Sequence, residues 1–580
     1  MHAVKHFRDT FHAALFAVAV LVLGACGQGG GDSAPPATSG PAPEPTTPAA
    51  ASRFLAQASF GANMSSVDNV SANGPVVWLD QQFAMPAGSP HQSYLVSVMA
   101  SLPADQSPQD SHVMNTFWRQ AATAPDQLRQ RVAFALSQIF VVSLTNDAVS
   151  QYKRGTASYL DMLGRQAFGN HRDLLEAVTL HPMMGLFLSH LRNQKESGNR
   201  VPDQNYAREV MQLLSIGLYQ LNPDGTLLLV NGQPVETYDQ EDIVGLSRVF
   251  TGFSWAGPDT QNGRFFGSDT PVPDPNRDVL PMQAYPQYHS TSVKSFLGTT
   301  IPAQGNSDPR IDLRIALDTI FNHPNVAPFF CRQLIQRLVT SNPSPAYVGR
   351  VSQVFNAGRF TRKDWSVGTG RRGDLRATIA AILLDEEARD MAKTADPTFG
   401  KVREPVLRLA AWMRAFNARS TSGSFLLGTT DDAASSLGQS AMRAPSVFNF
   451  YRPGYVPPNT AIAAANLVAP EFQIIHEVSV AGYANFMRTA VQSGVGSNSP
   501  RDIQADYAAE LALANDPDKL IDRIDLLLTY GTLSAETRSA MREAVSSVAI
   551  NASNPNPGRQ NRVYLAALFA VSAPEFLVQK

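Results

Sequence analysis

From about residue 51 to residue 580, hydrophobic positions recur mainly with the spacing of α-helices. After Pro125 and Asp126, the residues Leu128, Val132 and Leu136 fall on one stripe, as expected for a helix that buries one face. Comparable stripes lie near 172–192, 204–219, 239–251, 311–321, 326–339, 345–356, 374–388, 401–416, 469–490, 502–514, 517–529, 534–549 and 560–570. Few segments alternate with period two. The pattern therefore predicts a mainly α protein with a large multi-helix globular body.

One β-hairpin interrupts the helical pattern. An extended run over 226–230 is followed by Asn231-Gly232 and a second extended run over 233–238. Asn-Gly between two such runs is a strong hairpin signal. Residues 255–310 are rich in Gly, Pro, Asp and Asn, and we expect a long irregular loop there, of the kind that is often functional.

The N-terminus has the pattern of an export signal. Lys5 and Arg8 precede an apolar stretch over 13–23, which is too short to span a bilayer comfortably. Leu23-Gly24-Ala25-Cys26 then resembles the bacterial lipobox, in which the cysteine thiol accepts a diacylglyceryl group. We therefore predict a lipoprotein signal peptide over 1–25 and lipidation of Cys26. The alternative is an ordinary cleaved signal.

Residues 26–50 consist mainly of Gly, Ser, Pro, Thr and Ala, a composition that predicts a disordered, lipid-anchored tether before a helical body over 51–580. Gly27, rather than Asp, follows the cysteine. By resemblance to the sorting pattern of Gram-negative lipoproteins, this favours the outer membrane of the cell envelope. Several acyl chains would anchor the protein stably.

Composition limits the classes of protein to which the chain can belong. Hydrophobic residues make up 44% and charged residues 17% of the 580 residues, which indicates a packed globular body with a surface less charged than average. The formal net charge of −2 gives no basic excess for nucleic acid. If Cys26 is lipidated, Cys331 has no partner for a disulfide, and its apolar helical setting predicts a buried side chain. Two cysteines cannot build a multi-cysteine zinc site, and the sequence indicates no particular cofactor.

The segment 202–217 is the most distinctive candidate for chemistry. On a helix, its polar side chains fall within one arc, opposite an apolar arc; these side chains are Asn205, Arg208, Glu209 and Gln212. One interpretation is a structural ion pair of Glu209 with Arg208 or Lys195. The other is a site wall, with Glu209 as acid or base, Arg208 beside it, and Asn205 and Gln212 binding the ligand.

Histidines and acidic clusters give weaker signals. His289 lies in the irregular segment close to Lys294, so these two residues are candidates for catalysis and ligand binding, respectively. His181 and His323 precede prolines at helix starts, where an imidazole often satisfies backbone groups. Asp239 and Asp242 have the spacing of a capping box, and the acidic residues around them lack the spacing of a calcium loop. We predict no metal site. No G-x-S-x-G, P-loop or G-x-G-x-x-G motif occurs.

The segment 444–455 is dense in aromatic residues and has a proline near each end. Packing against the helical body is one interpretation. A surface for sugar or peptide, with Asn449 and Arg452 as polar contacts, is the other.

Several segments together resemble the bacterial DUF1800 family. The matching segments, in chain order, are Arg53–Gly61, Asp126–Ser137, Asn205–Glu209, Phe250–Gly252, Lys294 with Phe296–Gly298, Asn322–Pro324 and Ser446–Phe450. A departure is Phe253, where many relatives have Trp. The resemblance implies a mostly helical exported protein, often encoded beside a DUF1501 protein, a secreted family that resembles sulfatases and alkaline phosphatases. It supplies no catalytic residues.

Three functions are compatible with these observations. The first is a lipid-anchored envelope scaffold that binds another secreted protein, plausibly DUF1501-like. The second is an extracellular enzyme that acts on a polymer or protein and uses the arc around Arg208 and Glu209, together with His289 and Lys294. The third is a carbohydrate or adhesion module that uses the aromatic segments.

Overall fold

The computed structural model describes residues 40–306 and 308–580, and it confirms a mainly helical body with short two-stranded sheets. The predicted signal peptide, Cys26 and residues 26–39 of the predicted tether lie outside the described residues. The first part of the body contains α1 (Pro48–Ala58), α2 (Met64–Ala84), α3 (Pro90–Ser101), α4 (Asp110–Thr123), α5 (Gln127–Ser137), α6 (Asp147–Ser150), α7 (Lys153–Gln166), α8 (His171–Leu180), α9 (Pro182–Phe187) and α10 (Asn205–Gln212).

The middle of the chain mixes helices with hairpins. Its elements are β1 (Leu229–Val230), β2 (Gln233–Pro234), α11 (Gln240–Val249), β3 (Phe253–Ser254), α12 (Asn262–Phe266), β4 (Gln283–Ala284), η1 (Pro286–Tyr288), β5 (Lys294–Phe296), β6 (Thr299–Ile301), α13 (Pro309–Asn322), α14 (Val326–Leu338), α15 (Pro345–Ala357), β7 (Phe360–Arg362), β8 (Trp365–Val367), α16 (Leu375–Leu384), α17 (Glu386–Arg389) and η2 (Met391–Thr394).

The last part of the chain is again mainly helical. Its elements are β9 (Lys401–Val402), α18 (Pro405–Ala415), β10 (Arg419–Ser420), α19 (Ala461–Ala464), η3 (Pro470–Ile474), α20 (Glu477–Ser493), β11 (Ile503–Gln504), α21 (Ala508–Leu513), α22 (Pro517–Thr529), α23 (Ala535–Ser547), α24 (Asn556–Ser572), α25 (Pro574–Leu577) and β12 (Val578–Gln579). The strands pair antiparallel as β1–β2, β3–β4, β5–β6, β7–β8, β9–β12 and β10–β11.

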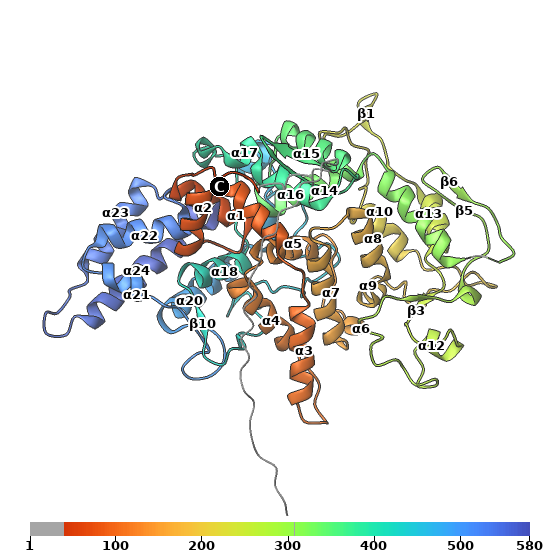
Figure 1. Cartoon of the computed structure of the whole chain (residues 1–580), viewed down its shortest axis with the longest axis horizontal. Coiled ribbons are helices and arrows are strands. Elements are labelled where there is room, and N and C mark those ends of the chain that lie inside the picture. The colour runs from red at the N-terminus through yellow and green to blue at the C-terminus, as the bar shows by residue number, and fades with distance from the viewer. Residues whose placement is uncertain (1–39, 307) are drawn as a thin grey trace, which may run out of the picture. The chain divides into compact units, whose positions relative to one another are not determined.

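The two ends of the body meet. Helix α1 packs against α2 and also against α22, while β12 pairs with β9 (Figure 1). Buried hydrophobic residues from α1 to α25 form one continuous core. Within the described residues, no helix is long and apolar enough to cross a membrane.

The body begins earlier than the predicted boundary at residue 51. Helix α1 starts at Pro48, and the backbone N–H of Glu44 donates to the carbonyl of Asn73 at 3.1 Å. The Glu44 carboxylate also pairs with Lys363 at 2.7 Å. Residues 44–50 therefore pack as part of the body rather than as tether.

Several predicted helices have different ends. The stripe over 172–192 is divided at His181, because Pro182 cannot donate a backbone hydrogen bond and begins α9 instead. The stripe over 204–219 stops at Gln212, and Gly217 has a φ of 76°, outside the helical region. The stripe over 469–490 is split into η3 and α20, and that over 502–514 contains β11 before the short α21.

Candidate functional site

The polar arc of α10 is present but is not an open site. Its members Asn205, Arg208 and Gln212 are half-buried, and Glu209 is buried. Burial raises the pKa of Glu209, and Arg208 opposes that shift. The predicted ion pair of Glu209 with Arg208 or Lys195 does not form among the described residues, and the Glu209 Oε2 atom has no hydrogen-bond partner there. Glu209 is thus the one predicted acid whose environment suits proton transfer, but it lies beneath the surface.

The structure brings together His289 and Lys294, two of the predicted candidate residues. Asp312 of α13 lies between them: its Oδ2 is 3.0 Å from His289 Nε2 and 2.9 Å from Lys294 Nζ. His289 Nδ1 lies 2.7 Å from the carbonyl of Thr251, and Lys294 Nζ donates to the carbonyl of Ser290 at 2.6 Å. His289, Lys294 and Asp312 are all fully buried. This trio fixes the irregular segment to α13, and its atoms are closed to a substrate from solvent.

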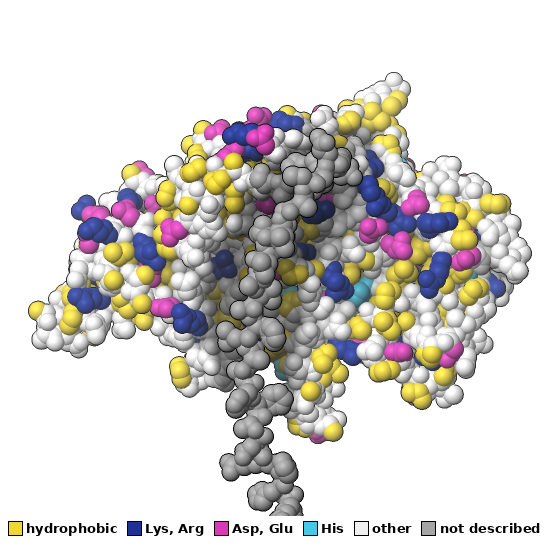
Figure 2. All heavy atoms as spheres, viewed as in Figure 1, with side chains coloured by type: hydrophobic (Ala, Val, Ile, Leu, Met, Phe, Trp, Pro, Cys, Tyr) yellow, Lys and Arg dark blue, Asp and Glu magenta, His cyan; other side chains and the backbone are white. Residues whose placement is uncertain are grey.

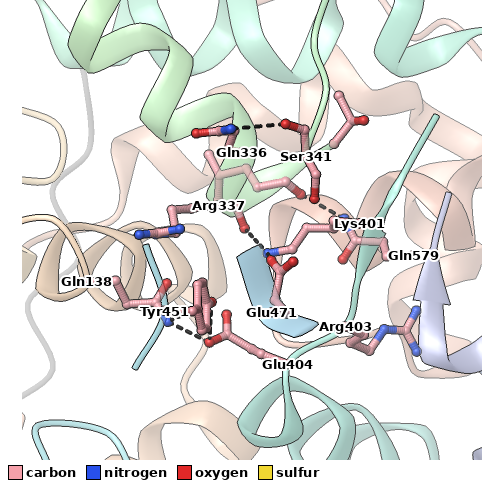
Figure 3. Close-up of polar contacts among 12 residues, drawn as sticks. Gln138, Gln336, Arg337, Ser341, Lys401, Arg403, Glu404, Tyr451, Glu471 and Gln579 are labelled. Carbon is pink, nitrogen blue, oxygen red and sulfur yellow. Dashed lines mark hydrogen bonds and ion pairs between the residues drawn. The ribbon is translucent and has the colours of Figure 1, made fainter. Parts of the chain in front are cut away.

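Another buried polar cluster lies at the C-terminal end of α14 (Figure 3). We call it the ionic network: Arg131, Arg337, Lys401, Glu404 and Glu471, with the hydrogen-bonding residues Gln138, Gln439, Tyr451 and Gln579. Each of these residues is at most 5% exposed.

Cations of the ionic network donate hydrogen bonds to carbonyl groups at the C-terminal end of α14. The last carbonyls of a helix lack partners within the helix and carry the negative end of its dipole. Arg131 and Lys401 both donate to the carbonyl of Arg337, Lys401 at 3.1 Å. Gln579 Nε2 donates to the carbonyl of Leu338 at 2.8 Å. A buried helix end therefore explains why cations gather here.

Two carboxylates balance these cations. Glu404 Oε2 accepts hydrogen bonds from Gln138 Nε2 at 2.5 Å, Gln439 Nε2 at 2.6 Å and the Tyr451 hydroxyl at 2.8 Å. Burial alone would raise the pKa of Glu404, but Lys401, Arg131 and these hydrogen bonds lower it overall. In Figure 3 the Lys401 side chain extends toward Glu471, to which it is paired at 3.1 Å. The ionic network thus joins segments that are far apart in the chain, from α5 to β12, and its role is structural.

The aromatic segment 444–455 contributes to the ionic network. Tyr451 points inward to Glu404, so the packing interpretation holds for this residue. Arg452 lies over the ring of Phe448, with its Cζ atom 4.7 Å from the ring centroid. Asn449 has a φ of 63° and is buried, and its Nδ2 has no hydrogen-bond partner among the described residues. Asn449 is thus buried, whereas Arg452 and Phe448 are exposed.

A different feature stands out on the surface. Residues 218–237 form a small antiparallel unit around β1 and β2, with additional bridges between Tyr219 and Glu236 and between Leu221 and Leu227. We call it the apolar hairpin, because five large hydrophobic side chains are 43–56% exposed on it: Leu218, Tyr219, Leu227, Leu229 and Val230. It projects from the body in Figure 1, and Figure 2 shows hydrophobic side chains along it. Residues 218–242 contain five acidic residues and no Lys or Arg.

The predicted helix caps and the predicted burial of Cys331 are confirmed. Asp239 and Asp242 form the capping box of α11, and His181 and His323 each accept a backbone N–H at 3.2 Å. Cys331 is buried in α14, where burial raises the pKa of its thiol well above the ordinary value. Within residues 40–306 and 308–580, no group of three or more His, Cys, Asp or Glu side chains could hold a metal ion.

Comparison with known proteins identifies the family. The family model described as "Protein of unknown function (DUF1800)" matches residues 53–578, nearly the whole body. The chain belongs to the DUF1800 family. A search of curated proteins and a search of solved structures each return no match. Membership of DUF1800 therefore supports the fold, and a function has to be argued from the residues.

Proposed function

We propose that this DUF1800 protein is a lipid-anchored component of the cell envelope that binds another secreted protein through the apolar hairpin. The observation that carries the proposal is the exposure of five large hydrophobic side chains on one projecting unit of about 20 residues. Contiguous apolar patches are uncommon on proteins that act alone and mark interaction sites. Transfer of apolar surface out of water is favourable by about 25 cal/mol per Å², and this gain offsets the entropic cost of association.

Charge favours a protein partner over a membrane surface. The hairpin and the start of α11 carry Asp224, Glu236, Asp239, Glu241 and Asp242 without any basic residue between 218 and 242. Anionic lipid headgroups would repel this surface. A protein with an apolar contact surrounded by Lys and Arg would complement it. A DUF1501-like secreted protein is the candidate partner, on the strength of the family resemblance.

The alternative of an extracellular enzyme depends on the convergence of α10, His289 and Lys294 in an open cleft. His289 and Lys294 are instead fully buried around Asp312. The carbohydrate alternative depends on exposed aromatic rings. Phe266 and Phe448 are 43% and 37% exposed, but Trp255, Phe265 and Tyr285 are buried in the first aromatic segment. The exposed apolar side chains of the hairpin instead favour a binding role.

A direct binding experiment tests the proposal. The mature chain and a purified DUF1501-like protein from the same genome are mixed, and the dissociation constant is measured by biolayer interferometry. Leu229→Ser with Val230→Ser should weaken binding at least tenfold, since a loss of about 1.4 kcal/mol corresponds to that factor. Val478→Ser with Val480→Ser on α20 is the matched control, because those valines are 52% and 56% exposed against 53% and 56% for Leu229 and Val230.

Each result has a defined meaning. Equal binding by the wild type and the hairpin variant would refute the hairpin as the contact. Absence of binding to the DUF1501-like protein would refute that partner. Binding should also weaken as salt concentration rises, because the acidic residues contribute by charge.

The anchor is tested separately. Cys26→Ser should release a folded protein from membranes into the soluble fraction. If that variant still sediments with membranes as the wild type does, a lipid on Cys26 is not the attachment.

A further inference from the structure

A second surface feature is a groove of about 1070 Å³ between α8 and α13, bordered by residues 253–258 and 280–283. The apolar part of its lining includes Leu180, Phe253, Met282 and Leu313. Two more apolar side chains on its rim, Leu280 and Ile311, are 40% and 46% exposed. The α8–α13 groove is thus large enough for a small ligand with an apolar body.

The groove lining contains four acidic residues and three arginines, and each acidic residue has a favourable interaction within the protein. Arg172 pairs with Glu176 at 2.7 Å and with Asp318 at 2.6 Å. Asp274 interacts electrostatically with Arg154 and Arg264, outside the groove. A further acid, Asp173, lies in the first turn of α8, where the helix dipole stabilises negative charge.

The remaining cations are not compensated in this way. Arg310 and Arg314 are exposed, lie one helical turn apart on α13 and line the groove. Neither forms an ion pair among the described residues, in contrast to Arg172 on the facing helix. Figure 2 shows basic and acidic side chains gathered over α8 and α13.

We propose that the α8–α13 groove binds an amphipathic anion, with its carboxylate or phosphate group at Arg310 and Arg314 and its apolar part on the lining of Phe253, Met282 and Leu313. Two guanidinium groups can grip such an anion through paired N–H donors, which gives geometric as well as electrostatic selectivity. A neutral molecule of the same shape would gain only the apolar contact. This site is independent of the apolar hairpin and of the proposed protein partner.

The test uses decyl phosphate below its micelle-forming concentration and the chain from residue 26 onward carrying Cys26→Ser. Isothermal titration should show saturable binding that is at least tenfold weaker for decanol. Arg310→Gln with Arg314→Gln should weaken decyl phosphate binding at least tenfold. The matched control is Arg538→Gln with Arg542→Gln on α23, another arginine pair one turn apart, whose members pair with Asp522 and Asp518. The control variant should bind as the wild type does.

A further variant tests the apolar contact, and a vesicle experiment identifies the source of the anion. Leu280→Ser, on the exposed rim, should weaken decyl phosphate binding several-fold without changing the melting temperature. Sedimentation with phosphatidylglycerol vesicles separates two sources of the ligand: vesicle binding that needs Arg310 and Arg314 indicates a bilayer lipid, whereas decyl phosphate binding alone indicates a free amphiphile. No saturable binding of either probe, equal affinity for decanol, or equal loss in the α23 control would overturn the proposal.

Discussion

Replacing Glu404 with glutamine removes one negative charge from the ionic network while keeping the size of the side chain. The wild-type Oε2 atom accepts three hydrogen bonds, and the carboxylate faces Lys401 and Arg131. Leaving buried charges without their counter-ion costs about 3–5 kcal/mol. Because glutamine retains one carbonyl oxygen, we expect a loss near the lower end, about 3 kcal/mol in the free energy of unfolding. That is more than a hundredfold in the folding equilibrium.

Glu386→Gln on α17 is the matched control. Glu386 also pairs with an arginine, Arg350 at 3.3 Å, but its side chain is 80% exposed. Exposed pairs of this kind contribute about 0–1 kcal/mol. Urea unfolding, followed by circular dichroism, measures both variants, and the comparison is valid if the slope with urea concentration is unchanged. Equal midpoints for Glu404→Gln and Glu386→Gln would refute our reasoning about the ionic network.

The pH dependence gives a second check. The pKa of Glu404 in the folded protein lies below its ordinary value of 4.5, so the folded state favours the charged form. Its contribution to stability is therefore present above pH 4.5 and is lost as the pH falls through the lowered pKa. The stability difference between the wild type and Glu404→Gln should shrink in acid. A constant difference from pH 7 to pH 3 would contradict the assignment.

Three further predictions follow from buried groups and close contacts. Asp312→Asn should destabilise the protein by about 3–5 kcal/mol in urea unfolding, because it leaves Lys294 buried beside a neutral side chain; a change below 1 kcal/mol would contradict this. Burial raises the pKa of Asp161 to about 7 from 3.8, so the wild type should lose stability as the pH rises through this interval, and Asp161→Asn should flatten that slope. Gly245→Ala should lower the melting temperature, since its Cβ would lie 1.7 Å from a carbonyl oxygen of β5. Gly164→Ala, with no atom within 4 Å of its Cβ, should raise it by helix propensity alone, and equal shifts would refute the contact argument.

Local chemistry made much of the fold predictable. The Asn231-Gly232 hairpin has φ values of 52° and 79°, both positive, which those two residue types tolerate best. The capping box of Asp239 and Asp242 marks the start of α11 as expected. Helix ends were harder to predict, because the apolar stripe over 204–219 continues past Gln212, where α10 ends in a turn that leads to Gly217.

The buried polar clusters could be predicted only in part. Asp312 occupies a position on the apolar stripe of α13, among Leu313, Ala316 and Ile320. Arg131 is likewise buried on the stripe of α5. A charged residue at a core position is a signal of a buried partner, but periodicity cannot name that partner. Which residue pairs with which depends on contacts between segments hundreds of residues apart, as between Gln138 and Glu404.

The ionic network also explains how loosely patterned segments are fixed in one arrangement. Cys331 is the cysteine in the described residues and is free, so no disulfide within them holds the loop 444–455, η3 or β12 in place. Apolar contacts alone are non-directional and would tolerate several positions of such segments. Tyr451 donates to Glu404, Gln579 donates to the carbonyl of Leu338 at the end of α14, and Glu471 pairs with Lys401. Each of these contacts has a defined geometry. Because buried charges contribute little net stability but cost much when mispaired, they favour one docking of these segments over its alternatives. Loss of Glu404 should therefore loosen the C-terminal segments before it unfolds the apolar hairpin, which lies on a different part of the body (Figure 1).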